Sequence, residues 1–167
     1  LVHIFDLIRF FGGEVTELQA FFNQVTDTQF AYAVNQRFES GAIGQLDLNS
    51  LEDSKGFRDI TEILELIGLE HHVVCDGKMG VRYQPKEDWT TATPHTGSYE
   101  YVWRPGWTGV GNGLNTFGYT SEVRHFARRC LGLVDEGPDL WDSYRALKIG
   151  EAVYDSAHGT GLVTLEY

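Results

Sequence analysis

The sequence predicts an α+β fold in which helices pack on one face of a large, mostly antiparallel, open sheet. Three observations support this fold class: a helical apolar pattern at the start, a long series of strand-like segments separated by turn residues, and two helical patterns before a last strand-like segment. Strands that follow one another through short turns pair antiparallel. The two later helices then need a sheet whose apolar face they cover.

The first predicted element is a helix over residues 3–13. Gly12 and Gly13 supply the left-handed stop that ends such a helix. The helical pattern is already under way where the sequence starts, and no Met precedes Leu1. The apolar face has the i, i+3, i+4, i+7 spacing and consists of Ile4, Leu7, Ile8 and Phe11.

Eight segments are predicted to be strands, because they are rich in aromatic and β-branched residues or alternate between apolar and polar side chains. In residues 42–49, Leu46 and Leu48 alternate with Gln45 and Asp47, which is typical of a sheet with one wet face. The predicted strands are residues 15–25, 29–38, 42–49, 62–67, 72–76, 79–84, 99–103 and 162–167.

Two further helices are predicted before the last strand. The first covers residues 120–134, and the Gly-Pro-Asp sequence at residues 137–139 opens the second, which runs to about Ala157. Cys130 falls on the apolar face of the first of these helices, where a buried free thiol is expected. Two cysteines without C-x-x-C spacing predict neither a disulfide framework nor a zinc site.

The length and the net charge of the chain exclude some classes of protein. With 167 residues, of which 42% are hydrophobic, the chain is expected to form one domain over residues 1–167. Its net charge of −11 repels nucleic acid and anionic membrane surfaces, so neither is an expected partner. No apolar run approaches the roughly 18 residues of a membrane span, and the first residues lack the basic start of a signal peptide. A cytoplasmic protein is therefore predicted.

Five segments, in order along the chain, resemble motifs of one enzyme family. Residues 3–7 read His-x-x-Asp-Leu and lead into a Gly-Glu-Val turn at residues 13–15. Residues 41–46 follow a Gly-x-Ile/Val-Gly-x-Leu-like pattern, and residues 119–126 read Tyr-x-x-Glu-x-x-His-Phe. Residues 143–157 resemble a closing helix with an Ala-Leu core and a Ser-Ala end. The chain thus resembles the C-terminal domain of the Gfo/Idh/MocA oxidoreductases, the glucose-fructose oxidoreductase and inositol dehydrogenase family.

The resemblance implies that this chain is one half of a two-domain enzyme. The family's N-terminal Rossmann domain binds NAD or NADP through a Gly-x-Gly-x-x-Gly turn and supplies a Lys from a Glu-Lys-Pro motif, and this domain is absent from the chain. No cofactor-binding residue is therefore expected here. Residues 109–114 lack the third glycine of the turn and a preceding strand, so they predict a loop.

The resemblance also implies partners. They are the chain's own N-terminal Rossmann domain and further copies of the chain, which form a dimer or a tetramer through the open face of the sheet. Phe22, Tyr32 and Val34 are expected to be exposed on that face, where an uncovered apolar surface would otherwise promote aggregation.

His3 is the residue that the resemblance marks as catalytic, because it matches the family's Asp-x-x-x-His motif, whose Asp would precede Leu1. Oxidation of a hydroxyl to a ketone removes the hydroxyl proton while hydride leaves for the nicotinamide. A base within hydrogen-bond reach is then required, and an imidazole suits that role. The alternative is an ordinary surface His at a helix start. Asp6 either orients His3 or pairs with Arg9, and the structural role is favoured.

His3, Trp103 and Trp107 are the predicted substrate-binding residues. The two Trp belong to an aromatic group within residues 85–118, whose rings can stack on the C–H face of a sugar. The same rings also suit a small core of that loop. No metal site is expected, because the adjacent His71 and His72 point to opposite faces of a strand.

The resemblance therefore predicts the substrate-binding and oligomerisation domain of an NAD(P)-dependent oxidoreductase that acts on a sugar, a cyclitol or a related polyol. In isolation the chain is expected to be inactive, because the cofactor site lies in the other domain. The alternative is a free-standing, non-catalytic α+β module that binds a ligand or scaffolds an assembly.

Overall fold

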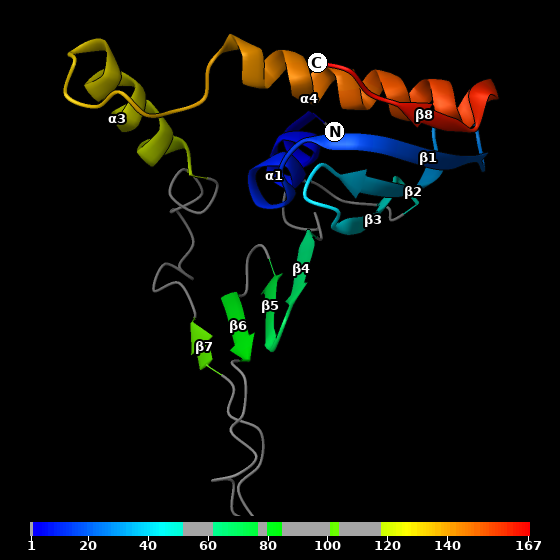
Figure 1. Ribbon diagram of the computed structural model, residues 1–167, viewed down its shortest axis with the longest axis horizontal. Coiled ribbons are helices and arrows are strands. Elements are labelled where there is room, and N and C mark those ends of the chain that lie inside the picture. The colour runs from blue at the N-terminus through cyan, green and yellow to red at the C-terminus, as the bar shows by residue number, and fades with distance from the viewer. Residues whose placement is uncertain (1, 52–61, 77–79, 85–100, 104–117) are drawn as a thin grey trace, which may run out of the picture. The chain divides into compact units, whose positions relative to one another are not determined.

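The computed structural model describes residues 2–51, 62–76, 80–84, 101–103 and 118–167. The chain forms two compact units, the first built from residues 1–53 and 136–167 and the second from residues 54–135 (Figure 1). Each unit contains a four-stranded antiparallel sheet and at least one helix, which confirms the predicted α+β class.

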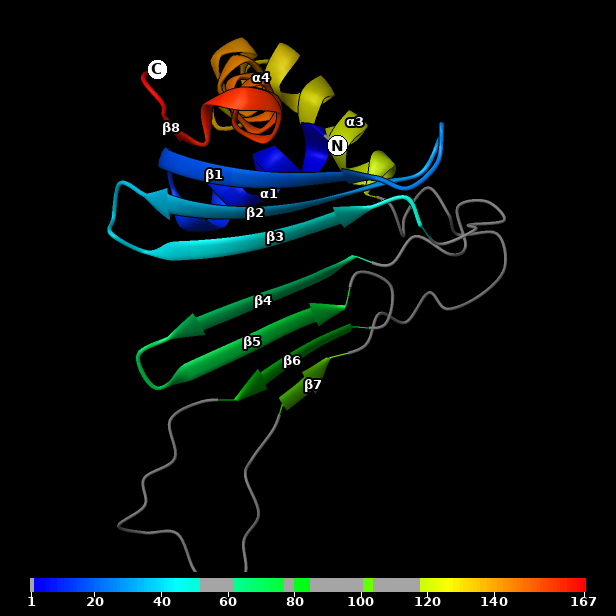
Figure 2. The same cartoon turned by 90° about the vertical axis from the view of Figure 1, so that its right-hand side faces the viewer.

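The first unit has two helices on one face of its sheet (Figure 2). The strand order is β3-β2-β1-β8, and every neighbouring pair is antiparallel. A single turn of π-helix, η1, connects the last helix to the last strand. The elements are α1 (Val2–Gly12), β1 (Val15–Gln24), β2 (Phe30–Phe38), β3 (Ile43–Asn49), α4 (Leu140–Asp155), η1 (Ser156–Thr160) and β8 (Leu162–Thr164).

An apolar core fills the space between this sheet and the two helices. Side chains alternate between the two faces of each strand, so every second residue of β1 and β2 faces the helices. In register, Ala20 lies opposite Val34, and Phe22 lies opposite Tyr32. The largest side chains that are fully buried are Leu18, Ile149, Val15 and Val34.

Phe22, Tyr32 and Val34 lie on the helix-covered face, so the prediction that they are exposed on the open face is wrong. Val34 is only 1% exposed, and Tyr32 packs against the core. The Phe22 and Tyr32 rings contact each other with their centroids 4.7 Å apart. The alternating pattern predicted which residues share a face, but it did not tell which face the helices cover.

The open face of the same sheet carries amide and alanine side chains beside three exposed large apolar side chains, Phe21, Ile43 and Leu162. Glu17 and Arg37 form an exposed ion pair there, with Nε 3.1 Å from Oε2. Phe21, 62% exposed, is a large apolar side chain on this face and lies opposite Ala33. The amide and alanine side chains of this face are Gln19, Asn23, Ala31, Ala33, Asn35, Gln45 and Asn49.

α1 buries only part of the predicted apolar face, because Ile8 is buried and Ile4 packs against the core, but the other two residues do not. Phe5 and Ile8 are buried, whereas Leu7 and Phe11, which the spacing placed on the core side, are exposed. The reason is that Arg9 is also buried. The helix is therefore rotated so that one guanidinium and two apolar side chains face inward together. The predicted stop is confirmed: the helix ends at Gly12, and Gly13 has a φ of 86°.

The second unit contains β4 (Ile63–Gly68), β5 (His71–Asp76), β6 (Gly80–Gln84), β7 (Tyr101–Trp103) and α3 (Tyr119–Cys130). Its sheet has the order β4-β5-β6-β7 and is antiparallel throughout. α3 stops four residues before the predicted Val134, because Gly132 adopts a φ of 67°. α3 has no buried side chain, and the prediction that Cys130 is buried is wrong, since this thiol is exposed.

Within the described residues, no helix combines the length and the hydropathy that a membrane span requires.

Candidate functional site

The candidate site lies at the first turn of α1, where His3 is located. Its side chain is exposed, so the imidazole is open to a molecule that approaches from solvent. Asp6, one turn further along, forms an ion pair with Arg9, in which its Oδ1 atom lies 3.5 Å from Nη1 of Arg9. This contact confirms the structural role that was favoured for Asp6.

The far end of α1 is held by a buried guanidinium. Arg9 donates from Nε to Oε2 of Glu14 over 3.0 Å and from Nη2 to Oε1 of Glu14 over 2.8 Å. Its Nη1 atom donates to the backbone carbonyl of Asp142 over 3.1 Å. Bidentate pairs of this kind fix both position and orientation. α1 is therefore tied at once to the start of β1 and to the first turn of α4.

The charges of this cluster shift the pKa values of its carboxyl groups. Hydrogen bonds from Arg9 hold the pKa of Glu14 below its ordinary value, and this effect outweighs the opposing effect of burial. A hydrogen bond from the backbone N–H of Asp139 is the main cause of the lowered pKa of Asp142. Arg145 adds a second cation, with Nη1 3.3 Å from Oε1 of Glu14. Both carboxylates are consequently stabilised in their charged form.

The first turn of α4 closes this arrangement with a capping box. Asp139 accepts hydrogen bonds from the backbone N–H groups of Trp141 and Asp142, and Asp142 Oδ2 accepts one from the backbone N–H of Asp139. Such reciprocal bonds satisfy N–H groups that a helix start leaves without partners. The Gly-Pro-Asp sequence thus begins the helix as predicted, with Asp139 as the N-cap.

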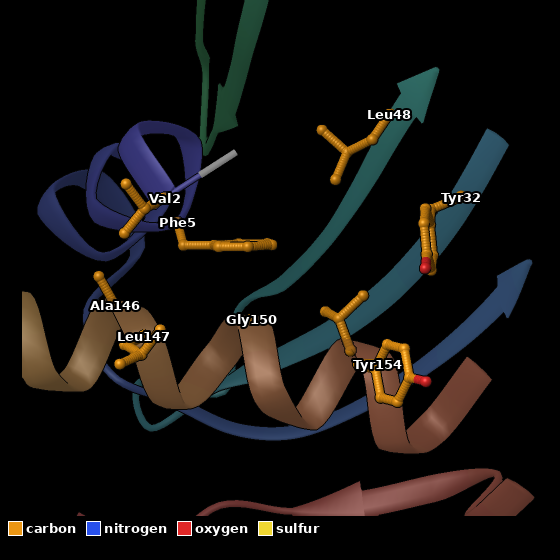
Figure 3. A pocket seen from close by; sticks show the side chains of 9 residues that line it. Val2, Phe5, Tyr32, Leu48, Ala146, Leu147, Gly150 and Tyr154 are labelled. Carbon is orange, nitrogen blue, oxygen red and sulfur yellow. The ribbon is translucent and has the colours of Figure 1, made fainter. Parts of the chain in front are cut away.

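Beside the first turn of α1 there is an apolar pocket of about 270 Å³ (Figure 3). Four elements form its walls: the start of α1, strands β2 and β3, and one side of α4. Val2, next to His3 in the sequence, lines the pocket, but His3 does not. The lining residues are Val2, Phe5, Tyr32, Leu48, Ala146, Leu147, Gly150, Val153 and Tyr154.

Aromatic side chains are stacked at one end of this pocket. The Tyr154 ring stacks on the His158 ring at 4.1 Å, and the Phe22 ring lies 4.8 Å from His158. Nδ1 of His158 lies 2.9 Å from the backbone carbonyl of Tyr154, which fixes the imidazole against the helix end. Burial, and secondly the nearby Tyr154, raise the pKa of Tyr32.

A buried serine holds the end of α4 against the sheet. Ser156 Oγ accepts a hydrogen bond from the backbone N–H of Ala20 over 2.8 Å and donates one to the carbonyl oxygen of Gly161. The serine is 4% exposed, so both bonds are shielded from water. His158 and Tyr154 therefore keep their position relative to β1.

The two other predicted site residues, Trp103 and Trp107, belong to the part of the sequence outside the first unit. Trp103 lies in β7 of the second unit, where its backbone pairs with Val81. Trp107 and residues 109–114 lie outside the described residues. The substrate-binding role of the two Trp side chains stays a prediction.

The adjacent histidines of β5 point to opposite faces, as predicted. His72 binds Glu65 with Nε2 2.6 Å from Oε1, whereas His71 Nδ1 lies 2.8 Å from the hydroxyl of Tyr83. Among the residues that the structure describes, no group of three or more His, Cys, Asp or Glu side chains is placed to hold a metal ion.

The residues missed by the sequence analysis are Glu14, Asp142 and the stacked pair Tyr154 and His158. Tyr154 and His158 have an i, i+4 spacing, which places two side chains on the same face of a helix and would have indicated the stack. Nothing local in the sequence indicated that Arg9 binds Asp142, because 133 residues separate them.

Comparisons with known proteins give matches in structure only. No family model matches the sequence. No curated protein matches it either. The chain is similar to a dehydrogenase from Chromobacterium violaceum, with a TM-score of 0.74 and 19% identity, over 93% of this chain and 44% of that chain.

Two further solved structures are similar. One is an oxidoreductase from Agrobacterium radiobacter in complex with NAD+, L-tartaric acid and magnesium, with a TM-score of 0.70 and 15% identity, over 98% of this chain and 47% of that chain. The other is a myo-inositol dehydrogenase from Corynebacterium glutamicum, with a TM-score of 0.55 and 21% identity, over 99% of this chain and 48% of that chain.

This chain spans less than half the length of each of these three proteins. The likeness shows that the chain shares its α+β fold with part of these larger proteins, which agrees with the fold that the sequence resemblance implied.

Proposed function

We propose that this chain is the substrate-binding and oligomerisation domain of an NAD(P)-dependent oxidoreductase that acts on a sugar, a cyclitol or a related polyol. The observation that carries the proposal is the match of nearly the whole chain to under half of larger dehydrogenases. One of these binds NAD+, and another is a myo-inositol dehydrogenase. The nicotinamide would be held by a separate Rossmann domain, and it supplies the hydride acceptor when bound.

In this proposal His3 accepts the proton of the substrate hydroxyl. Three features of the described residues support the role. The imidazole is exposed, it lies on the first turn of α1, and the other end of that helix is fixed by Arg9. A base must keep its position relative to the reacting oxygen, and a side chain on a tied helix meets that requirement better than one on a loop.

The test starts with the genomic reading frame that encodes residues 1–167. We expect an upstream segment with Gly-x-Gly-x-x-Gly, Glu-Lys-Pro and an Asp four residues before His3. The longer protein should then reduce NAD or NADP with a polyol such as myo-inositol, and His3→Asn should lower kcat on the order of a thousandfold. The control is His125→Asn, an exposed His on α3, which should leave kcat unchanged.

Two results would contradict this role. One is a reading frame without such a segment, combined with no reduction of NAD or NADP, which would favour the free-standing module. The other is reduction of NAD or NADP by residues 1–167 alone, because the proposal places the cofactor site in another domain.

The second part of the proposal is that copies of this chain associate through the open face of the β3-β2-β1-β8 sheet. The strand residues of this face include only three charged side chains, Glu17, Arg37 and Asp47, although the whole chain carries a net charge of −11. Weakly charged surfaces that carry an exposed aromatic side chain are typical of interfaces. Phe21 beside Ala33 supplies such a side chain next to a small one.

Sedimentation velocity tests this association. We expect a dimer or tetramer at micromolar concentration and a shift to monomer for Phe21→Lys. Phe10→Lys is the matched control, because Phe10 is 80% exposed on α1 and lies away from the sheet face. A monomer at all concentrations, or equal shifts for both variants, would exclude the open face as the interface.

A further inference from the structure

We propose that the apolar pocket beside α1 is a binding site for a small, uncharged, aromatic molecule that carries one hydroxyl group. This site is separate from the polyol site proposed above, and the inference does not depend on that function. The pocket of about 270 Å³ is bounded by α1, α4, β2 and β3, all within the first unit (Figure 3).

The lining excludes a polyol. None of the nine lining side chains carries a charge or an amide, and only the two tyrosines carry a hydroxyl. A polyol in this pocket would leave several of its hydroxyl groups without partners, and each such buried group costs about 1–3 kcal/mol. An apolar ring meets the same walls without that cost.

The two tyrosines indicate that one polar group is accepted at one end. Figure 3 shows Tyr32 and Tyr154 at the end of the pocket opposite Val2. In the described part of the chain, neither phenol hydroxyl has a hydrogen-bond partner. Each can therefore donate to, or accept from, one ligand hydroxyl placed between them.

The shape of the pocket is formed without a ligand. Phe5, Ala146 and Val153 are at most 5% exposed, so the inner surface belongs to the core. Gly150 keeps the Phe5 ring close to α4, because a Cβ atom at this position would lie 3.2 Å from Cε2 of Phe5. The stack of Tyr154 on His158 fixes the polar end in the same way.

The volume limits the size of the ligand. Apolar cavities of about 150 Å³ hold a benzene ring, and sites for drug-sized molecules start at about 300 Å³. A pocket of about 270 Å³ therefore suits one or two fused rings with a single substituent. We choose 2-naphthol as the probe, naphthalene as the probe without a hydroxyl, and myo-inositol as the polyol.

The experiment is calorimetric titration of residues 1–167 with each probe, together with NMR chemical-shift mapping. We expect saturable binding of 2-naphthol at one site, binding of naphthalene about fivefold weaker because one hydrogen bond is missing, and no shift with myo-inositol. The shifted amides should be those of the lining residues on α1, β2 and α4. The chain alone is used without cofactor, so this test and the dehydrogenase assay fail independently.

Variants separate the pocket from unspecific binding to exposed apolar side chains. Leu147→Trp places a larger ring at the pocket wall and should abolish binding, whereas Leu140→Trp, on the same helix but outside the pocket and 87% exposed, should leave it unchanged. The double variant Tyr32→Phe with Tyr154→Phe should make 2-naphthol and naphthalene bind equally. Thermal unfolding confirms that each variant is folded.

Three results overturn the proposal. They are the absence of saturable 2-naphthol binding to the folded wild-type chain, binding that survives in folded Leu147→Trp, and displacement of 2-naphthol by myo-inositol. The last result would identify the pocket as a polyol site instead.

Discussion

The two ends of α1 differ in almost every physical respect. At the C-terminal end, Arg9 is buried and bound to Glu14 and Asp142, and Gly12 lies directly under the Phe38 ring. At the N-terminal end, His3 is exposed and the helix borders an open apolar pocket. One end of the same eleven-residue helix is thus held by a buried ion cluster, whereas the first turn at the other end carries an exposed imidazole.

This difference shows how a short helix can expose the His3 side chain to solvent while the helix itself stays fixed in position. The buried ion cluster fixes the position and the rotation of α1, because Arg9 reaches both β1 and α4. The imidazole of His3, at the opposite end, is then exposed to solvent at a fixed place. In the function proposed above, stability and chemistry are separated along this helix, which predicts that mutations at the two ends have different effects.

The largest expected effect follows removal of the buried guanidinium. Arg9→Ala leaves Glu14 without its main partner and removes a second partner from Asp142, and breaking a buried ion pair costs about 3 kcal/mol in the free energy of unfolding. Urea unfolding followed by circular dichroism measures the loss. The matched control is Arg37→Ala, which removes an exposed ion pair with Glu17 and should cost less than about 1 kcal/mol. Equal losses would show that burial does not distinguish the two pairs.

A smaller loss is expected where α1 touches β2 most closely. A Cβ atom at Gly12 would lie 2.4 Å from Cε1 of the Phe38 ring, which is itself buried. Overpacking of this kind costs about 2 kcal/mol, so Gly12→Ala should unfold at lower urea concentration. The double variant Gly12→Ala with Phe38→Leu should lose less than the sum of the two single variants. Strict additivity would mean that the ring is not the cause.

The sequence predicts the features of the two ends that depend on neighbouring residues. It does not predict those that depend on residues far apart in the sequence. The first six strands, the helix stop at Gly12 and the capped start at Asp139 all rest on local patterns, and the structure confirms them. The last strand is shorter than predicted and covers only Leu162–Thr164. The buried face of α1 does not rest on a local pattern. Leu7 and Phe11 have the right spacing for the core and are exposed, whereas the buried Arg9 binds Asp142, far along the chain.

The same limit applies to the two faces of the sheet. Alternation correctly grouped Phe22, Tyr32 and Val34 with one another, but the assignment of that group to the open face was wrong. A period of two carries no information on which side a helix packs. His3 is the opposite case: its proposed role comes from a motif resemblance, and the structure adds that it is exposed.

Acid should weaken the end of α1 that Arg9 ties to Glu14. The pKa of Glu14 is lowered in the folded chain from its ordinary value of 4.5, first by the hydrogen bonds from Arg9. The unfolded chain therefore takes up this proton more readily, so the contribution of Glu14 to stability is fully present above about pH 4.5 and is lost as the pH falls below that value. Urea unfolding between pH 3 and pH 7 should show this decline. Glu14→Gln should flatten it, and an unchanged slope would contradict the assignment.

The smallest effect is expected at the free end. His3→Asn removes a side chain that is exposed, so the free energy of unfolding should change by less than about 0.5 kcal/mol. Urea unfolding of this variant and of Arg9→Ala compares how much the two ends of α1 contribute to the free energy of unfolding. A loss at His3 close to that at Arg9 would mean that the first turn is as strongly held as the last, and the separation of stability from chemistry along α1 would be refuted. A near-zero change, together with the large loss of kcat expected in the longer protein, would establish that the imidazole is placed for reaction and not for folding.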